Sequence, residues 1–131
     1  MRFLPRLVLL AVGAYGVASL THFWHNAEFC GDYPNLPVWI TRGSVWLSWA
    51  GLTLLGGVGL WLLRRGCRKS GLGLLAFYGA LGCYGLGHYN LAPIARHTAM
   101  INFSIWFEVI AGLILLAVAL GTLIGETRQR V

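Results

Sequence analysis

The sequence predicts an all-α integral membrane protein, folded as a compact antiparallel four-helix transmembrane bundle with both termini cytoplasmic. Three observations predict this fold. Hydrophobic residues make up 57% and charged residues 11% of the 131 residues, whereas soluble domains average roughly 45–50% and about 25%. Four apolar segments are each long enough to cross about 30 Å of hydrocarbon as a helix. Most basic residues lie in connections on one side of these segments, which the positive-inside rule places in the cytoplasm.

The four predicted spans leave only short connections, so they account for the whole chain as one domain. They cover residues 7–24, 43–63, 70–87 and 98–125, and Glu108 is the one permanently charged residue within them. Eight of the ten basic residues fall on the side that holds both termini: Arg2, Arg6, Arg64, Arg65, Arg68, Lys69, Arg128 and Arg130. The connections at 25–42 and 88–97 are therefore expected outside, and we expect the membrane to be a bacterial cytoplasmic membrane.

The first span has a competing interpretation. Residues 1–20 combine a basic start, an apolar stretch and Val17-Ala18-Ser19, which is the pattern of a secretory signal with a cleavage site. The apolar run continues past that point to Trp24. We therefore favour a retained first helix.

Turn-forming residues separate the remaining spans. Gly31, Pro34 and Pro37 interrupt the first outer connection, and Pro93 marks the second. The fourth helix has two candidate starts, because proline suits a first helical turn and Thr98 is a good N-cap.

Small residues spaced by four are expected to let the helices approach closely, as in many membrane proteins. They are Ala14 and Ala18 on the first span, Gly79, Cys83 and Gly87 on the third, and Ala117, Gly121 and Gly125 on the fourth.

Polar side chains form one stripe on each span when residues are projected at about 100° per residue. The stripes are Tyr15, Ser19, His22 and Asn26; then Arg42, Trp46, Trp49 and Thr53; then Tyr84 and His88; and finally His97, Ser104 and Glu108. Lipid does not tolerate such stripes, so they should face inward. We expect them to line a cleft open to the outside, with Tyr15, Ser19, Tyr84, Ser104 and Glu108 as its polar lining.

All four histidines belong to the outer side in this topology. His22 and His25 lie three residues apart on one helix face, while His88 and His97 flank the second outer connection. Histidine nitrogens from several helices can bind copper, zinc or a b-type haem. The four histidines are thus candidate metal or cofactor ligands, although no fixed metal or haem motif is present.

Glu108 is the second candidate for function, because an ionisable group near the middle of a span is costly and rare. The alternative is a protonated glutamic acid that hydrogen-bonds a neighbouring helix and fixes the bundle. We expect its carboxyl group to point into the bundle and to meet Tyr15 or Ser19.

Three classes of function agree with this sequence. The first is a metal or haem protein that serves as an accessory or small subunit of a membrane complex. The second is a small membrane enzyme in which His and Glu perform acid and base steps on a lipid-like substrate. The third is a purely structural subunit. The lipid bilayer is the expected environment, with a membrane-protein partner or a second copy of the chain as candidate partners. Nucleic acid is not expected, because membrane orientation already accounts for the basic residues.

Overall fold

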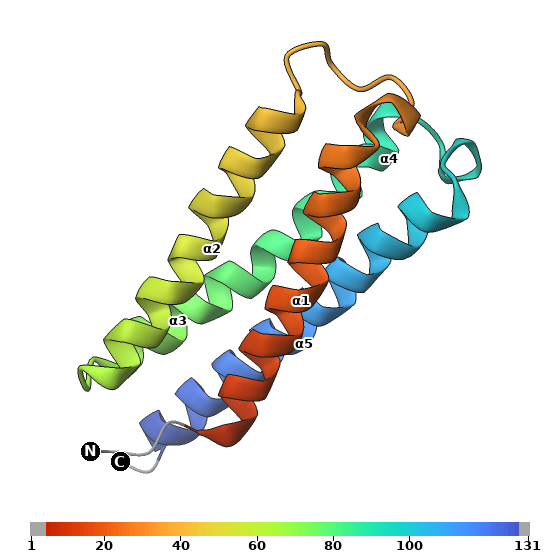
Figure 1. The fold of residues 1–131 in the computed structure, drawn as a ribbon. Coiled ribbons are helices and arrows are strands. Elements are labelled where there is room, and N and C mark those ends of the chain that lie inside the picture. Colours follow the sequence, from red (N-terminus) through yellow and green to blue (C-terminus); the bar gives the residue numbers. More distant parts are fainter. Residues whose placement is uncertain (1–4, 129–131) are drawn as a thin grey trace.

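The structure, a computed structural model, describes residues 5–128. Throughout this range the chain is helical apart from its connections, and four helices are long and apolar enough to cross a membrane (Figure 1). The elements are α1 (Arg6–Glu28), η1 (Cys30–Asp32), α2 (Arg42–Arg64), α3 (Arg68–Ala80), η2 (Leu81–Gly87), α4 (His88–Leu91), η3 (Ile94–Arg96) and α5 (Ala99–Arg128). The third span, Arg68–Leu91, is one run of α3, η2 and α4. The predicted all-α, four-span bundle is confirmed.

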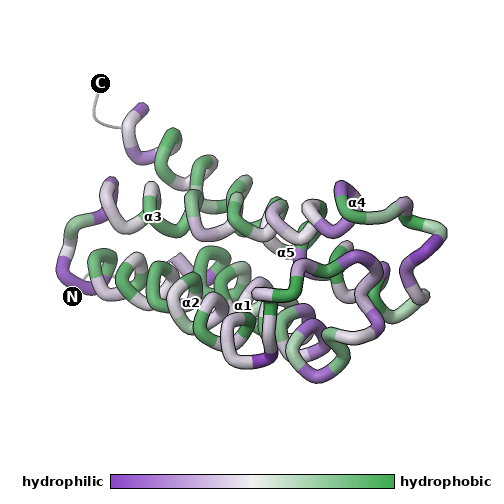
Figure 2. Tube along the Cα trace, turned by 90° about the horizontal axis from the view of Figure 1, so that it is seen from above, coloured by the Kyte–Doolittle hydropathy of each residue, from purple (hydrophilic) through white to green (hydrophobic). Residues whose placement is uncertain are grey.

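The bundle has two distinct ends. Helix α1 begins and α5 ends beside the tight turn between α2 and α3, which we call the turn end (Figure 1). The opposite end carries residues 29–41, here called the α1–α2 loop, and residues 92–98 before α5; we call it the loop end. Hydrophilic residues gather at both ends, with apolar residues between them (Figure 2). Among the basic residues expected at the turn end, Arg2 and Arg130 lie outside the described range.

Local sequence explains where the helices begin. The Thr41 hydroxyl accepts from the Ser44 backbone N–H, and the Ser44 hydroxyl accepts from the Thr41 N–H, so a capping box starts α2. Before α5, the Thr98 hydroxyl accepts from the Ile101 N–H at 3.2 Å. Thr98, and not Pro93, therefore starts the fourth span.

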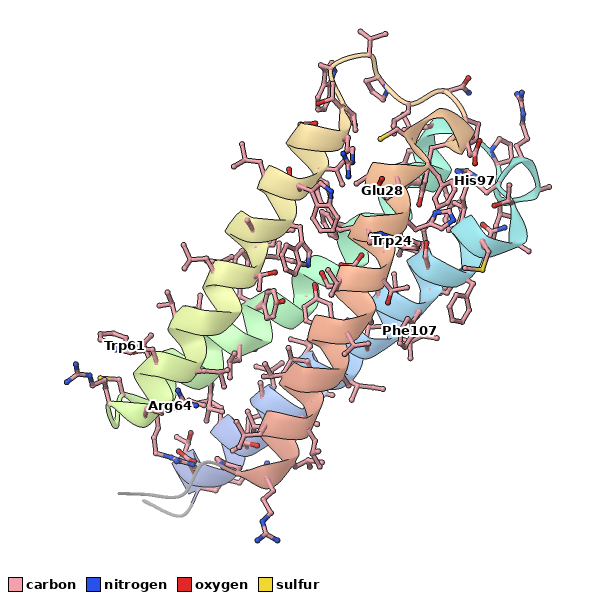
Figure 3. The ribbon with its side chains drawn as sticks, viewed as in Figure 1. Trp24, Glu28, Trp61, Arg64, His97 and Phe107 are labelled. Carbon is pink, nitrogen blue, oxygen red and sulfur yellow. The ribbon has the colours of Figure 1, made fainter. Side chains whose placement is uncertain are left out.

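Apolar packing dominates the half of the bundle toward the turn end. Side chains from all four spans form one buried cluster there, which contains Val8, Leu63, Leu72, Leu75, Ala76 and Ala119. Trp61 and Arg64 mark this end of α2 in Figure 3. Arg68 and Glu126 form an ion pair between α3 and α5. This half thus holds the spans together through contacts that need no polar partner within the membrane.

The third span approaches α5 through glycines that are three residues apart. A Cβ atom added to Gly79 would lie 2.6 Å from the carbonyl oxygen of Gly112, and one added to Gly82 would lie 3.0 Å from the carbonyl oxygen of Glu108. Spacing by three follows from η2, because side chains at i and i+3 eclipse in a 3₁₀ helix. The predicted spacing by four is wrong here, since added Cβ atoms at Gly87, Gly121 and Gly125 would meet open space.

Candidate functional site

The buried polar side chains of residues 5–128 gather in the half of the bundle toward the loop end. They are Ser19, His22, His25, Asn26, His97, Ser104 and Glu108. On α1 the stripe repeats at helical spacing, so its side chains share the face that packs against α5. Ser104 and Glu108 are one turn apart on α5 and face the same interior. The inward orientation that the sequence predicts for these two stripes is confirmed by their burial.

The centre of this cluster is a pair formed by His22 and Glu108. The His22 Nε2 atom lies 3.8 Å from the Glu108 Oε2 atom, and both side chains are 3% exposed. On the other edge of the ring, His22 Nδ1 lies 3.2 Å from the Ser104 hydroxyl oxygen. That hydroxyl donates its own proton to the Ile101 carbonyl at 2.9 Å. Ser104 therefore accepts from His22 Nδ1–H, and the lone pair of Nε2 points toward the carboxyl group.

A glycine of the third span and buried polar residues of α1 surround this pair. A Cβ atom at Gly85 would lie 3.5 Å from Glu108 Oε2 and 3.7 Å from His22 Nε2, so the third span faces the pair with a residue that has no side chain. Ser19 is buried three residues before His22 on the same face of α1. Tyr15 is also buried on this face of α1. The burial of Glu108 confirms that its side chain points inward. Its contact with Ser19 or Tyr15 stays a prediction, and His22 is a neighbour that stripe geometry did not name.

A second layer of polar contacts lies nearer the loop end. The rings of His22 and His88 are 5.5 Å apart between centroids. The Asn26 amide nitrogen lies 3.2 Å from His88 Nε2. His25 Nδ1 lies 3.0 Å from the Tyr33 hydroxyl, and the Tyr33 ring is 4.8 Å from the His88 ring. Three of the four histidines thus share one connected cluster.

Tyr33 connects these groups although it lies in the α1–α2 loop. Its side chain is 3% exposed, and its hydroxyl contacts His25 Nδ1. Burial raises the pKa of the Tyr33 phenol, so it remains a neutral donor around neutral pH. Sequence reasoning missed this residue. Its one signal was the presence of a large aromatic side chain within a polar turn, and no helical spacing applies there.

His97 occupies a different position from the one predicted by the stripe on α5. It precedes the helix in extended conformation, so it does not lie above Ser104 and Glu108. Its Nδ1 atom bonds to the Pro93 carbonyl oxygen at 3.1 Å, and its ring packs edge-on against Tyr89 at 5.3 Å. Figure 3 shows His97 at the loop end, close to the start of α5. It is buried, but it belongs to a separate contact group.

Tyr84 does not line the interior, and this part of the predicted polar lining is wrong. The side chain is 84% exposed. Tyr84 and His88 would share a face in an α-helix, but about 120° per residue in the 3₁₀ segment η2 turns them apart. The row of Gly79, Gly82 and Gly85 continues to His88 at the same spacing by three. The glycine row and His88 therefore face the bundle while Tyr84 faces outward.

Two buried acceptor atoms near this cluster have no hydrogen-bond partner: His97 Nε2 and Asn26 Oδ1. Because His97 Nδ1–H donates to Pro93, its Nε2 atom carries a free lone pair. Buried polar atoms normally find a partner in the protein or in ordered water. Within residues 5–128, no three His, Cys, Asp or Glu side chains already stand close enough to hold a metal ion together.

No protein-family model, no curated protein and no solved structure matches this chain. Its function is therefore inferred from the side chains of the loop-end half.

Proposed function

We propose that this small four-span membrane protein binds a divalent transition-metal ion, zinc or copper, between His22 and Glu108. We further propose that it does so as an accessory or small subunit of a membrane complex. One observation carries the proposal: two buried side-chain atoms that can bind a metal, His22 Nε2 and Glu108 Oε2, face each other at 3.8 Å. This separation is too long for a hydrogen bond. A cation between them would bind both, with the carboxyl group deprotonated.

The separation suits two ligands of a single ion. With bonds of about 2.0–2.1 Å, two ligand atoms are roughly 3.4 Å apart at a tetrahedral angle and about 4.2 Å apart when opposed. The observed 3.8 Å lies between these limits. The bond from His22 Nδ1–H to Ser104 also resembles a common arrangement, in which the far nitrogen of a metal-binding histidine donates to a fixed acceptor.

His88 is the best candidate for a third ligand. Its ring contacts that of His22, and its Nε2 atom is held by the Asn26 amide, which can release it by rotating. Gly85 itself contributes no side-chain atom to the adjacent face of the pair. A single ion fits this spacing, whereas a b-type haem would require His22 and Glu108 to move apart. We therefore prefer an ion to a haem.

The charge distribution supports an orientation with the loop end outside and both termini in the cytoplasm. Six basic residues lie near the turn end: Arg6, Arg64, Arg65, Arg68, Lys69 and Arg128. Arg42 and Arg96 lie near the loop end. Short basic segments favour the cytoplasmic side. The ion would then enter the site from outside the cell.

The test compares the metal content of purified variants after equilibration with Zn²⁺ in detergent and removal of unbound ions. The wild type is expected to retain zinc, and Glu108→Gln is expected to lose it because the neutral amide is a poor ligand. Glu28→Gln is the matched control, since it makes the same change on an exposed loop-end carboxylate that is paired with Arg42.

Two outcomes would contradict metal binding. Equal and negligible zinc in all three proteins would favour a structural role, in which the polar cluster only specifies packing. Zinc retained equally by Glu108→Gln would place the ion elsewhere. An acid–base role on a lipid-like substrate would instead predict a metal-free protein whose Glu108→Gln variant keeps its thermal stability.

A further inference from the structure

The α1–α2 loop folds back over the proposed site. Tyr33 is buried, whereas its neighbours Asp32 and Asn35 are exposed, so the Tyr33 side chain is inserted into the bundle, and Leu36 packs against the same cluster. There it hydrogen-bonds His25, contacts the His88 ring and joins the apolar cluster of Ile101 and Ile105. Tyr33 thereby covers the loop-end side of the histidine cluster.

Few polar contacts hold the loop in this position. The Asn35 amide donates to the Leu91 carbonyl at 2.8 Å, and this bond is exposed to solvent. The Arg42–Glu28 ion pair at 2.8 Å is also exposed, and such pairs contribute little. The loop contains only the three-residue η1 as regular structure. Exposed hydrogen bonds of this kind open more readily than buried ones.

The closed arrangement leaves no direct path from solvent to the His22–Glu108 pair. His22, Ser104 and Glu108 are at most 3% exposed. Approach from the sides is blocked for a hydrated ion, because the helices there are apolar and face lipid. The remaining approach passes the loop end, where Tyr33 lies above His25 and His88.

We propose that the α1–α2 loop is the gate of this site, with the Tyr33 side chain as its plug and the Asn35–Leu91 hydrogen bond as its latch. The proposal rests on metal binding between His22 and Glu108. A zinc ion enters when the latch opens and Tyr33 swings away from His25 and His88. The loop closes in the same way over the empty and the occupied site.

A variant that opens the gate and a variant that removes a metal-binding side chain change the rates of zinc binding and release in different ways. If a variant favours the open loop equally in the free and the bound protein, association and dissociation of the ion accelerate by the same factor. The dissociation constant then stays unchanged. Removing a ligand instead weakens equilibrium binding. General destabilisation lowers the melting temperature and the affinity together.

Asn35→Gly is the variant that weakens the latch alone. Asn35 has φ of 58°, a left-handed conformation that glycine adopts without strain and alanine does not. The substitution removes the side-chain amide while the turn keeps its shape. Loss of one such hydrogen bond should raise the open population about fivefold. Ser48→Ala is the control, because the Ser48 hydroxyl bonds only to its own helix at the Ser44 carbonyl.

Cys30 reports opening without any metal. Its thiol donates to the Asn26 carbonyl at 2.9 Å, and partial burial raises its pKa, so it should react slowly while the loop is closed. In a background of Cys67→Ser and Cys83→Ala, a membrane-impermeant maleimide modifies this thiol alone. Asn35→Gly should label about fivefold faster than the background protein, and Ser48→Ala should label at the background rate.

Stopped-flow mixing with Zn²⁺, followed by chelation, measures both ion rates on the same proteins. The gate predicts equal acceleration of binding and release in Asn35→Gly with an unchanged dissociation constant. Zinc binding with unchanged rates and unchanged Cys30 labelling would overturn the gate while leaving metal binding intact. A changed dissociation constant would also overturn it. If the wild type binds no zinc, metal binding fails and the gate fails with it, and Cys30 labelling then shows only whether the loop opens.

Discussion

The two halves of this bundle use the same four spans in different ways. Toward the turn end, the interior is a cluster of aliphatic side chains contributed by every span, with Leu72 and Leu75 fully buried at its centre. Toward the loop end, the interior holds histidine, serine, asparagine and glutamate side chains that contact one another. The apolar half therefore holds the helices together, and the polar half determines which groups meet.

This difference follows from what a membrane interior requires. Apolar side chains gain nothing by leaving lipid for another helix except better packing, so the turn-end half depends on close fit. Polar side chains need partners at that depth, so each one in the loop-end half constrains its neighbours. Loss of packing in the turn-end half should thus lower the free energy of unfolding and leave zinc affinity unchanged. Loss of a polar partner in the loop-end half should mainly lower zinc affinity and change stability little. The predictions below test that separation.

The largest expected effect lies where the two halves join. An added Cβ at Gly112 would clash with the carbonyl oxygen of Gly79 and would lie 3.3 Å from the ring of Tyr15. Backbone cannot move aside locally, so Gly112→Ala should force α5 away from the third span. We expect the free energy of unfolding to fall by about 3 kcal/mol. Reversible denaturation in detergent micelles measures this change.

Gly121→Ala is the matched control on the same helix, because its added Cβ meets open space. Alanine is the better helix former by about 1 kcal/mol, so this variant should be neutral or slightly more stable. If both alanine variants behaved alike, the close approach of Gly79 and Gly112 would have no energetic role.

A smaller loss of stability is expected from the apolar half itself. Leu75 is fully buried, and Leu75→Ala should lower the free energy of unfolding by about 2 kcal/mol through lost packing. Zinc affinity should stay at the wild-type value, because the proposed site lies in the other half. Leu113→Ala, at a position 46% exposed to lipid, is the control and should change stability little. A clear loss of zinc affinity in Leu75→Ala would show that the halves are coupled.

Helical periodicity predicted those parts of the fold and site that are regular. Ser19, His22 and Glu108 all lie where about 100° per residue places them, because α1 and α5 are unbroken α-helices. Tyr84 and His97 do not, because the first is in a 3₁₀ segment and the second precedes its helix. Nothing local in the sequence marks the change to 3₁₀ geometry, since it accompanies the close approach of the third span to α5.

The contacts of the connections were also hard to predict, because they depend on how the helices pack. A turn could be expected around Pro34 from composition alone, but the insertion of Tyr33 depends on the space between α1, α5 and His88. That space exists only after the helices have packed. Spacing along the chain therefore predicts which groups share a helix face, whereas contacts made by loop residues depend on tertiary structure.

The smallest stability effect and the sharpest test of the polar half come from Ser104. Its hydroxyl oxygen accepts from His22 Nδ1–H, so Ser104→Ala leaves that N–H without its acceptor and frees the ring to turn. We expect the free energy of unfolding to fall by only about 1 kcal/mol, because one buried hydrogen bond is lost and the aliphatic cluster is untouched. Zinc affinity should fall about tenfold, since groups that orient a metal-binding histidine have effects of this size.

Ser48→Ala is the control: it removes a hydroxyl that bonds within α2, and it should change neither the free energy of unfolding nor zinc affinity. Leu75→Ala and Ser104→Ala therefore have opposite expected effects: the first mainly lowers stability, and the second mainly lowers zinc affinity. If Ser104→Ala instead lowered stability as much as Leu75→Ala and left zinc affinity unchanged, the loop-end half would also be packing alone, and the division of the bundle would not hold.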